Sequence, residues 1–193
     1  MKLYYSPGAC SLAAHIALTE AGAPFQIERV DLKTKQTESG ADFMTINPKG
    51  YVPALVLDSG EIVTENVAVL DWIATQNPAL GFDGPLGRTR LLEALTFIST
   101  ELHKSFKPFF VGASEEEKLK ATHLISKRLA FLDERTEGPF PRISVADCYL
   151  FVMLTWAMKF SIPVPDELLA LRGSMLGRPA VQRAMAREGL GVV

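Results

Sequence analysis

Residues 3–30 read LYYSPGACSLAAHIALTEAGAPFQIERV, and this stretch decides the fold of the first part of the chain. Residues 3–5 are typical of a short strand, which a Ser-Pro-Gly turn ends. The alanine-rich run that follows predicts a helix from Cys10 or Ser11 to Gly22, where a glycine and a nearby proline stop it. Residues 25–30 predict a second strand. Two strands around so short a helix are expected to be parallel neighbours joined by a right-handed crossover.

The next segment predicts a hairpin and a second helix. Residues 54–57 and 62–63 are apolar runs around a turn that contains Gly60, a pattern typical of a β-hairpin. Residues 65–76 predict a helix, because their apolar side chains recur at spacings of three and four. The first third of the chain is therefore expected to form an α/β unit of the order βαβ, an irregular or helical link, ββ and α.

A dense group of glycines and prolines between residues 76 and 90 predicts a domain boundary. We expect an α/β domain over residues 1–77, a linker over 78–87 and an all-helical domain over 88–193. Within the second domain, an apolar stripe over residues 91–109 predicts one long helix, and a charged surface helix is expected over 115–137, broken by residues 138–141. Ser144 and Asp147 fit a capping box in front of a nearly all-apolar helix, which makes Cys148 an inert core residue.

Composition and charge exclude several classes of protein. The chain has 193 residues, of which 48% are hydrophobic, and carries 20 Lys and Arg against 22 Asp and Glu. Disorder is excluded as the main state, and no basic field favours nucleic acid. The longest apolar run, over 145–160, is shorter than the roughly 20 residues of a membrane span. Two distant cysteines and no histidines at ligand spacing predict a reducing cytoplasm and no metal site.

Four positions are candidates for chemistry. Cys10 stands between a strand end and a helix start, where the helix dipole is expected to lower the thiol pKa, although a small packing residue fits there equally well. Ser11 is either a helix cap or a donor to a thiolate. Val52-Pro53 is either a plain strand start or, if the bond is cis, a pair whose Val52 backbone faces a ligand. Glu65 and Asn66 open a helix and either complement its dipole or hold a ligand's amino and carboxylate groups.

The histidines and one row of polar residues are interpreted without a catalytic role. Thr96, Ser99 or Thr100, His103 and Lys107 form a row at helical spacing, which is usually a solvated face. His15 and His123 are read as structural or exposed.

Taken in order, four motifs resemble the bacterial beta-class glutathione transferases. They are YYSPGACSLA at 4–13, NPKGYVPAL at 47–55, TEN at 64–66 and TELHK at 100–104, and the capping box lies where this superfamily has its own. The resemblance covers nearly the whole chain. It implies a thioredoxin-like domain, an all-helical domain, and a cytosolic homodimer that binds glutathione between the two domains.

The resemblance also implies roles for individual residues. Cys10 would face the glutathione sulfur, helped by Ser11 and His103 as catalytic groups. Val52, before a cis Pro53, would pair with the cysteinyl part, Glu65 and Asn66 would take the γ-glutamyl end, and Lys35 would neutralise the glycyl carboxylate. Thr100 and Phe106 match positions that the neighbouring subunit approaches. The residues expected to bind glutathione are Tyr5, Lys35, Tyr51, Val52, Pro53, Glu65, Asn66, Thr100 and Phe106.

The resemblance makes the chain an enzyme that joins glutathione thiolate to small hydrophobic electrophiles, and glutathione is then its co-substrate. Two alternatives stay open. One is a glutathione-dependent disulfide reductase or peroxidase with Cys10 as its nucleophile; because Ala13 replaces a resolving cysteine, only a monothiol route is available to it. The other is a non-catalytic module that binds ligands or proteins.

Overall fold

The computed structural model describes residues 1–134 and 142–191. Five strands form one mixed sheet in the order β3-β2-β1-β4-β5. The central strand β1 (Lys2–Tyr5) pairs in parallel with β2 (Gln26–Asp31) and antiparallel with β4 (Ala54–Val56). The edges are β3 (Gln36–Thr37) and β5 (Ile62–Thr64). The parallel strand–helix–strand unit and the β4–β5 hairpin are confirmed, whereas β3 falls within the predicted link.

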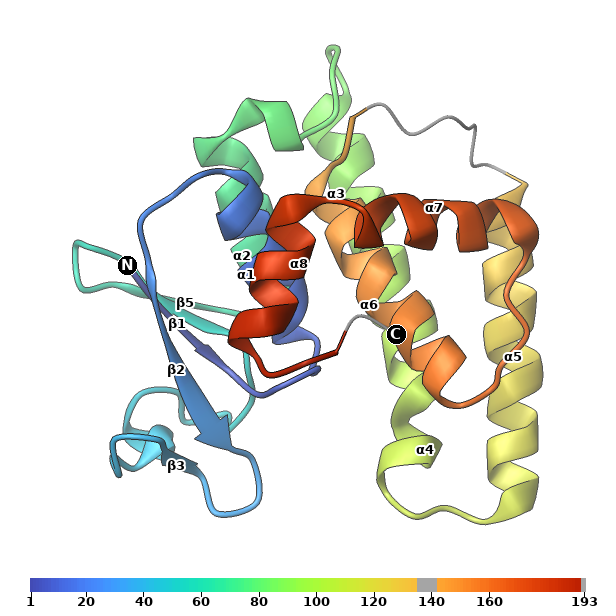
Figure 1. Cartoon of the computed structure of the whole chain (residues 1–193), viewed down its shortest axis with the longest axis horizontal. Helices are drawn as coiled ribbons and strands as arrows, with labels where there is room; N and C mark the ends of the chain where they lie inside the picture. Colours follow the sequence, from blue (N-terminus) through green and yellow to red (C-terminus); the bar gives the residue numbers. More distant parts are fainter. Residues whose placement is uncertain (135–141, 192–193) are drawn as a thin grey trace.

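Two helices lie between the sheet and the rest of the molecule (Figure 1). Helix α1 (Ser11–Glu20) and helix α2 (Asn66–Gln76) pack on each other, and both contact α6 of the helical part. Residues 11–18 of α1 are all buried, because the helix has neighbours on both sides. This explains its alanines: small side chains let the sheet and the helical part approach the same helix. Short 3₁₀ turns follow at Phe43–Thr45 and Pro78–Leu80.

The rest of the chain is helical in its described residues. Helix α3 (Gly87–Phe97) leads through a π turn (Ile98–Leu102) and a 3₁₀ turn (His103–Phe106) into α4 (Lys107–Phe110). Then come α5 (Glu115–Asp133), α6 (Val145–Lys159), α7 (Asp166–Leu176) and α8 (Pro179–Arg187). Figure 1 shows α8 returning to α1, so the end of the described chain lies against its first helix.

The prediction of one continuous helix over residues 91–109 is wrong in detail. The apolar stripe is largely buried as expected, but the hydrogen-bond pattern changes three times after Phe97. Pro108 has no N–H to continue the ladder, and the Ser105 hydroxyl donates to the Glu101 carbonyl at 2.7 Å. A competing side-chain donor and a missing backbone donor both favour a local irregularity. The irregular segment spans the π turn and the 3₁₀ turn, and His103 opens the 3₁₀ turn.

Helix α6 is the centre of the core. The Ser144–Asp147 capping box is confirmed, with both reciprocal hydrogen bonds present. Cys148 is fully buried as predicted, and burial raises the pKa of its thiol. One apolar cluster runs from Leu3 of the sheet to Met185 of α8.

One expectation is confirmed only in part, and another is not tested by the structure. The predicted helix over 115–137 is confirmed to Asp133; residues 135–137 and the break at 138–141 lie outside the described residues. The division at 78–87 stays a prediction. Within the described ranges, no helix is long and apolar enough to cross a membrane.

Candidate active site

A cavity of about 1170 Å³ opens where the sheet domain meets the helices, beside the first residues of α1 and α2. It gathers residues that are far apart in the sequence, from the loop before α1 to the segment after α8. Seven predicted site residues line it: Cys10, Tyr51, Val52, Pro53, Glu65, Asn66 and His103.

Cys10 is the residue immediately before α1, and its partly buried side chain faces the loop before β4. Its Sγ donates to the Val52 carbonyl at 3.4 Å. Burial raises the pKa of the Cys10 thiol to about 12, although the backbone N–H groups of Cys10 and Ser11 act in the opposite direction. The predicted lowering of this pKa is therefore wrong: at neutral pH Cys10 is a protonated thiol that donates a hydrogen bond.

The Val52–Pro53 peptide bond is cis, which answers the question that the sequence left open. The loop is held in place from behind, because Asn47 Nδ2 donates to the Tyr51 carbonyl at 2.7 Å. The Val52 carbonyl points to Cys10, so this backbone forms one wall of the cavity next to the thiol.

Glu65 and Asn66 lie where α2 begins. Glu65 has a φ of 69°, a left-handed conformation that costs a side-chain-bearing residue about 1 kcal/mol or more and is common at functional sites. Its carboxylate accepts a hydrogen bond from Lys49 Nζ at 2.6 Å. Asn66 is buried, and neither Oδ1 nor Nδ2 of its side chain has a hydrogen-bond partner within the described residues. A buried amide without partners is expensive, so this side chain is suited to a polar ligand.

His103 enters the cavity from the helical part. Its Nδ1 lies 2.6 Å from the Tyr149 hydroxyl, and its ring packs edge to face on Trp156 at 5.2 Å between centroids. Burial, aided by the charge of Lys104, lowers the pKa of His103 to about 4. Burial also raises the pKa of Tyr149. At neutral pH both groups are therefore uncharged and joined by one hydrogen bond, which presents an imidazole rather than an imidazolium to the cavity.

Five other predicted residues do not line the cavity. Ser11 is fully buried, and its hydroxyl exchanges weak hydrogen bonds with the Ser6 backbone, so it is not placed to donate to a ligand sulfur. Tyr5 is buried against the His15 ring. Phe106 is completely buried beside Trp156, and exposed Thr100 donates to the Thr96 carbonyl, so their contacts with glutathione stay predictions. Lys35 lies over the Tyr51 ring and donates to the Gly50 carbonyl.

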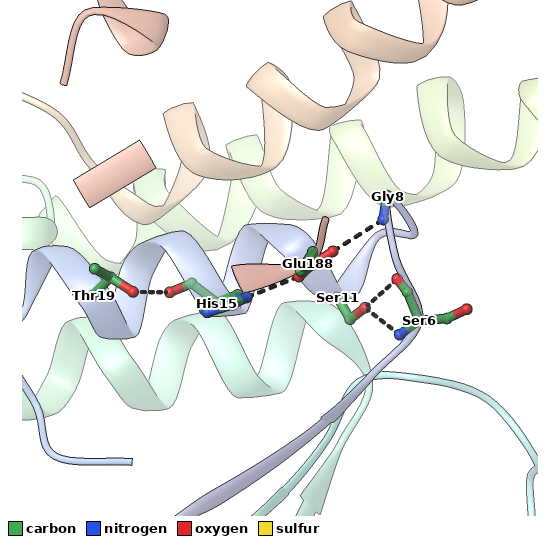
Figure 2. Close-up of polar contacts among 6 residues, drawn as sticks. All are labelled: Ser6, Gly8, Ser11, His15, Thr19 and Glu188. Atoms are coloured by element: carbon green, nitrogen blue, oxygen red, sulfur yellow. Dashed lines mark hydrogen bonds and ion pairs between the residues drawn. The ribbon is translucent and has the colours of Figure 1, made fainter. Parts of the chain in front are cut away.

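A buried polar network supports the loop before Cys10 (Figure 2). Glu188, which follows α8, accepts from the Gly8 N–H at 2.9 Å and lies 2.8 Å from His15 Nδ1 of α1. The side chains of both His15 and Glu188 are fully buried. Trp156 Nε1 donates to the Gly8 carbonyl at 2.8 Å. The Gly8 N–H is thus held by Glu188 from the segment after α8, and the Gly8 carbonyl by Trp156 from α6.

Sequence reasoning missed four residues of this region, namely Lys49, Tyr149, Trp156 and Glu188. Their contacts join positions up to 180 residues apart, and neither periodicity nor motif spacing signals such contacts. The structural reading of His15 is confirmed.

Comparisons with known proteins agree with this geometry. Residues 8–76 match the model of the glutathione S-transferase N-terminal domain. The chain is 40% identical to glutathione S-transferase GstA of Escherichia coli O157:H7, over 98% of this chain and all of that protein. A beta-class enzyme of Sphingomonas chungbukensis has a TM-score of 0.90 at 47% identity, covering 99% and 100% of the two chains. A sphingomonad glutathione S-transferase solved in complex with glutathione has a TM-score of 0.88 at 46% identity, with the same coverage. The chain therefore belongs to the glutathione S-transferase family, and its resemblance to the bacterial beta class is confirmed.

Proposed function

We propose that this protein is an enzyme that binds glutathione in the cavity and joins its sulfur to an electrophilic carbon. The observation that carries the proposal is the meeting of Cys10, Val52, Glu65, Asn66 and His103 in one cavity of a glutathione S-transferase chain. The cavity volume of about 1170 Å³ leaves room for a tripeptide and a second small molecule.

The first turn of α2 is suited to the γ-glutamyl group. Its ammonium replaces Lys49 as the partner of the Glu65 carboxylate, and its carboxylate takes the unpartnered Asn66 amide together with free N–H groups of the helix. The Val52 backbone then pairs with the cysteinyl residue, which brings the glutathione sulfur to Cys10.

At the sulfur, the site offers uncharged hydrogen-bond donors to the thiolate in place of water. The Cys10 thiol turns from Val52 to the sulfur, while Tyr149 donates to His103 Nδ1 and leaves the ring proton on Nε2 as a second donor. These donors and the N-terminus of α1 lower the pKa of the bound glutathione thiol, so that more of it is thiolate at neutral pH. The thiolate attacks the electrophilic carbon, and the leaving group departs with its electron pair.

Glutathione binding is tested by titration calorimetry and by conjugation of an activated chlorodinitrobenzene. We expect Asn66→Ala to weaken glutathione binding about tenfold, the loss of roughly one hydrogen bond to a charged group. Gln76→Ala, at the exposed opposite end of α2, is the matched control and should bind normally. No binding at millimolar glutathione would exclude the proposal and leave the non-catalytic module.

The Cys10 thiol separates the transferase from the reductase. A pKa of about 12 makes Cys10 a poor nucleophile at neutral pH, which favours conjugation. We expect Cys10→Ala to retain at least a tenth of the conjugation rate, and wild type to reduce a glutathione mixed disulfide only slowly. Fast reduction that Cys10→Ala abolishes would favour the reductase or peroxidase instead.

We also propose a cytoplasmic homodimer that takes a small hydrophobic electrophile. Two unpaired cysteines suit a reducing compartment, and family membership supports the dimer. Light scattering coupled to gel filtration should give twice the 21.1 kDa chain mass; a single-chain mass would refute this.

A further inference from the structure

The part of the cavity beyond His103 has an aromatic wall. Trp156 packs on His103 at 5.2 Å and on Phe110 at 4.8 Å between ring centroids. Phe110 is 51% exposed although it lines the cavity, so its ring offers apolar surface to a ligand. An aromatic molecule is the natural occupant, because ring pairs gain geometry-dependent attraction beyond the area that they bury.

Among the described residues that line the cavity, lysines outnumber carboxylates. Three lysines line the cavity (Lys49, Lys104 and Lys159), whereas Glu65 is the one carboxylate among the described residues of its lining, in a chain whose net charge is −2. Lys49 already pairs with Glu65. Neither Lys104 nor Lys159 has a carboxylate within salt-bridge distance among residues 1–134 and 142–191. The low-dielectric walls of a cavity concentrate the electric field of the charges that line it, so these two lysines favour an anion there.

Lys159 is placed where that anion would be bound. Its Nζ lies 6.0 Å from the centroid of Phe110 and 5.5 Å from that of Phe160. Successive contacts thus lead from His103 to Trp156, then to Phe110, and end at an ammonium group. The polar group beside the reacting sulfur and the free cation lie at opposite ends of one aromatic wall.

We propose that the electrophile is an aromatic compound that carries a carboxylate, with its ring on Trp156 and Phe110 and its carboxylate paired with Lys159. This inference rests on the proposed glutathione transfer. In the reaction, a carbon–sulfur bond forms at the ring carbon that bears a halide, and the carbon–halogen bond breaks as halide leaves with the electron pair. The thiol proton has already passed to solvent, so no oxidant or reductant is needed.

The test compares two substrates that differ in charge. Chlorodinitrobenzoate carries the carboxylate, and chlorodinitrobenzotrifluoride is its neutral analogue with an electron-withdrawing group at the same position. The readout is the ratio of kcat/KM for the benzoate to kcat/KM for the neutral compound. Because Lys159 is exposed, we expect Lys159→Met to lower this ratio about three- to fivefold, as for one exposed ion pair. Lys159→Arg should restore it, and added salt should lower the wild-type ratio.

The control is Lys127→Met, which removes an equal charge from exposed α5, outside the cavity lining. Its ratio should stay within twofold of wild type. If Lys159→Met also stays within twofold while the neutral substrate is conjugated, the inference is overturned and the proposed transfer stands. If neither substrate is conjugated, the proposed transfer itself fails, and this inference fails with it.

Discussion

Replacing Glu188 by alanine should destabilise the protein far more than its position near the end of the described chain suggests. Its carboxylate is fully buried and serves two partners, the Gly8 N–H in the loop before Cys10 and His15 Nδ1 in α1. Glu188→Ala removes the acceptor from both: the His15 side chain is completely buried, whereas Gly8 is only half-buried beside the cavity.

The magnitude follows from the two groups left unpaired. A buried donor without an acceptor costs about 1–3 kcal/mol, so buried His15 and half-buried Gly8 together give a loss of about 3 kcal/mol in the free energy of unfolding. His15→Ala leaves the Glu188 carboxylate buried with a single partner and should cost a similar amount. Because the two residues share one interaction, the double variant should lose at least about 1 kcal/mol less than the sum of the single losses.

The assay is urea unfolding followed by circular dichroism at one fixed protein concentration, since unfolding of an oligomer depends on concentration. Glu116→Ala is the control, because it breaks the exposed pair with Lys120 on α5 and should cost only about 0.3–0.5 kcal/mol. A loss below about 1 kcal/mol for Glu188→Ala, or losses that add within about 0.5 kcal/mol in the double variant, would refute the reasoning.

Three further predictions concern single groups. The pKa of His103 is about 4 when folded and 6.5 when unfolded, so its contribution to wild-type stability is complete above pH 6.5 and about 3 kcal/mol of it is lost as the pH falls to 4. His103→Gln should remove this loss, as urea unfolding at each pH would show. Ser144→Ala should cost about 1 kcal/mol, because it removes one half of a two-bond capping box, and an unchanged urea midpoint would count against this. Alkylation of Cys10 at pH 8 should be at least about a hundredfold slower than that of a free thiol and should accelerate above pH 10, as mass mapping of the modified peptide would show; rapid labelling at pH 8 would contradict the raised pKa.

Local patterns predicted most of the secondary structure. The parallel strands around α1, the β4–β5 hairpin and the Ser144 cap each depend on residues close in sequence, whose turn and capping chemistry is short-range. The π turn at Ile98–Leu102 was beyond such reasoning, because the spacing of buried residues hardly changes when one turn of a helix widens. The short edge strand β3 has only two residues, too few for an alternating pattern.

The candidate site was predictable only where a motif carries its residues. Asn66 and Glu65 adjoin in sequence, and their helix places both at the cavity. Glu188 and Trp156 meet Gly8 through contacts across most of the chain, and nothing in their own neighbourhoods marks them. Phe106 lies just beyond the TELHK motif, and its large apolar side chain is driven into the core instead of lining the cavity.

Cys10 shows how magnitudes decide between two correct physical effects. A helix N-terminus stabilises a nearby anion by about 0.3–1 kcal/mol, and by about 2 kcal/mol in favourable sites, which lowers a pKa by little more than one unit. Burial moves the Cys10 pKa from 9.0 to about 12, which corresponds to about 4 kcal/mol against the thiolate. The dipole is present, but it is outweighed, so position at a helix start does not by itself predict a reactive cysteine. A protonated Cys10 suits a site in which the negative sulfur belongs to the bound glutathione, because two thiolates in one partly enclosed cavity would repel each other.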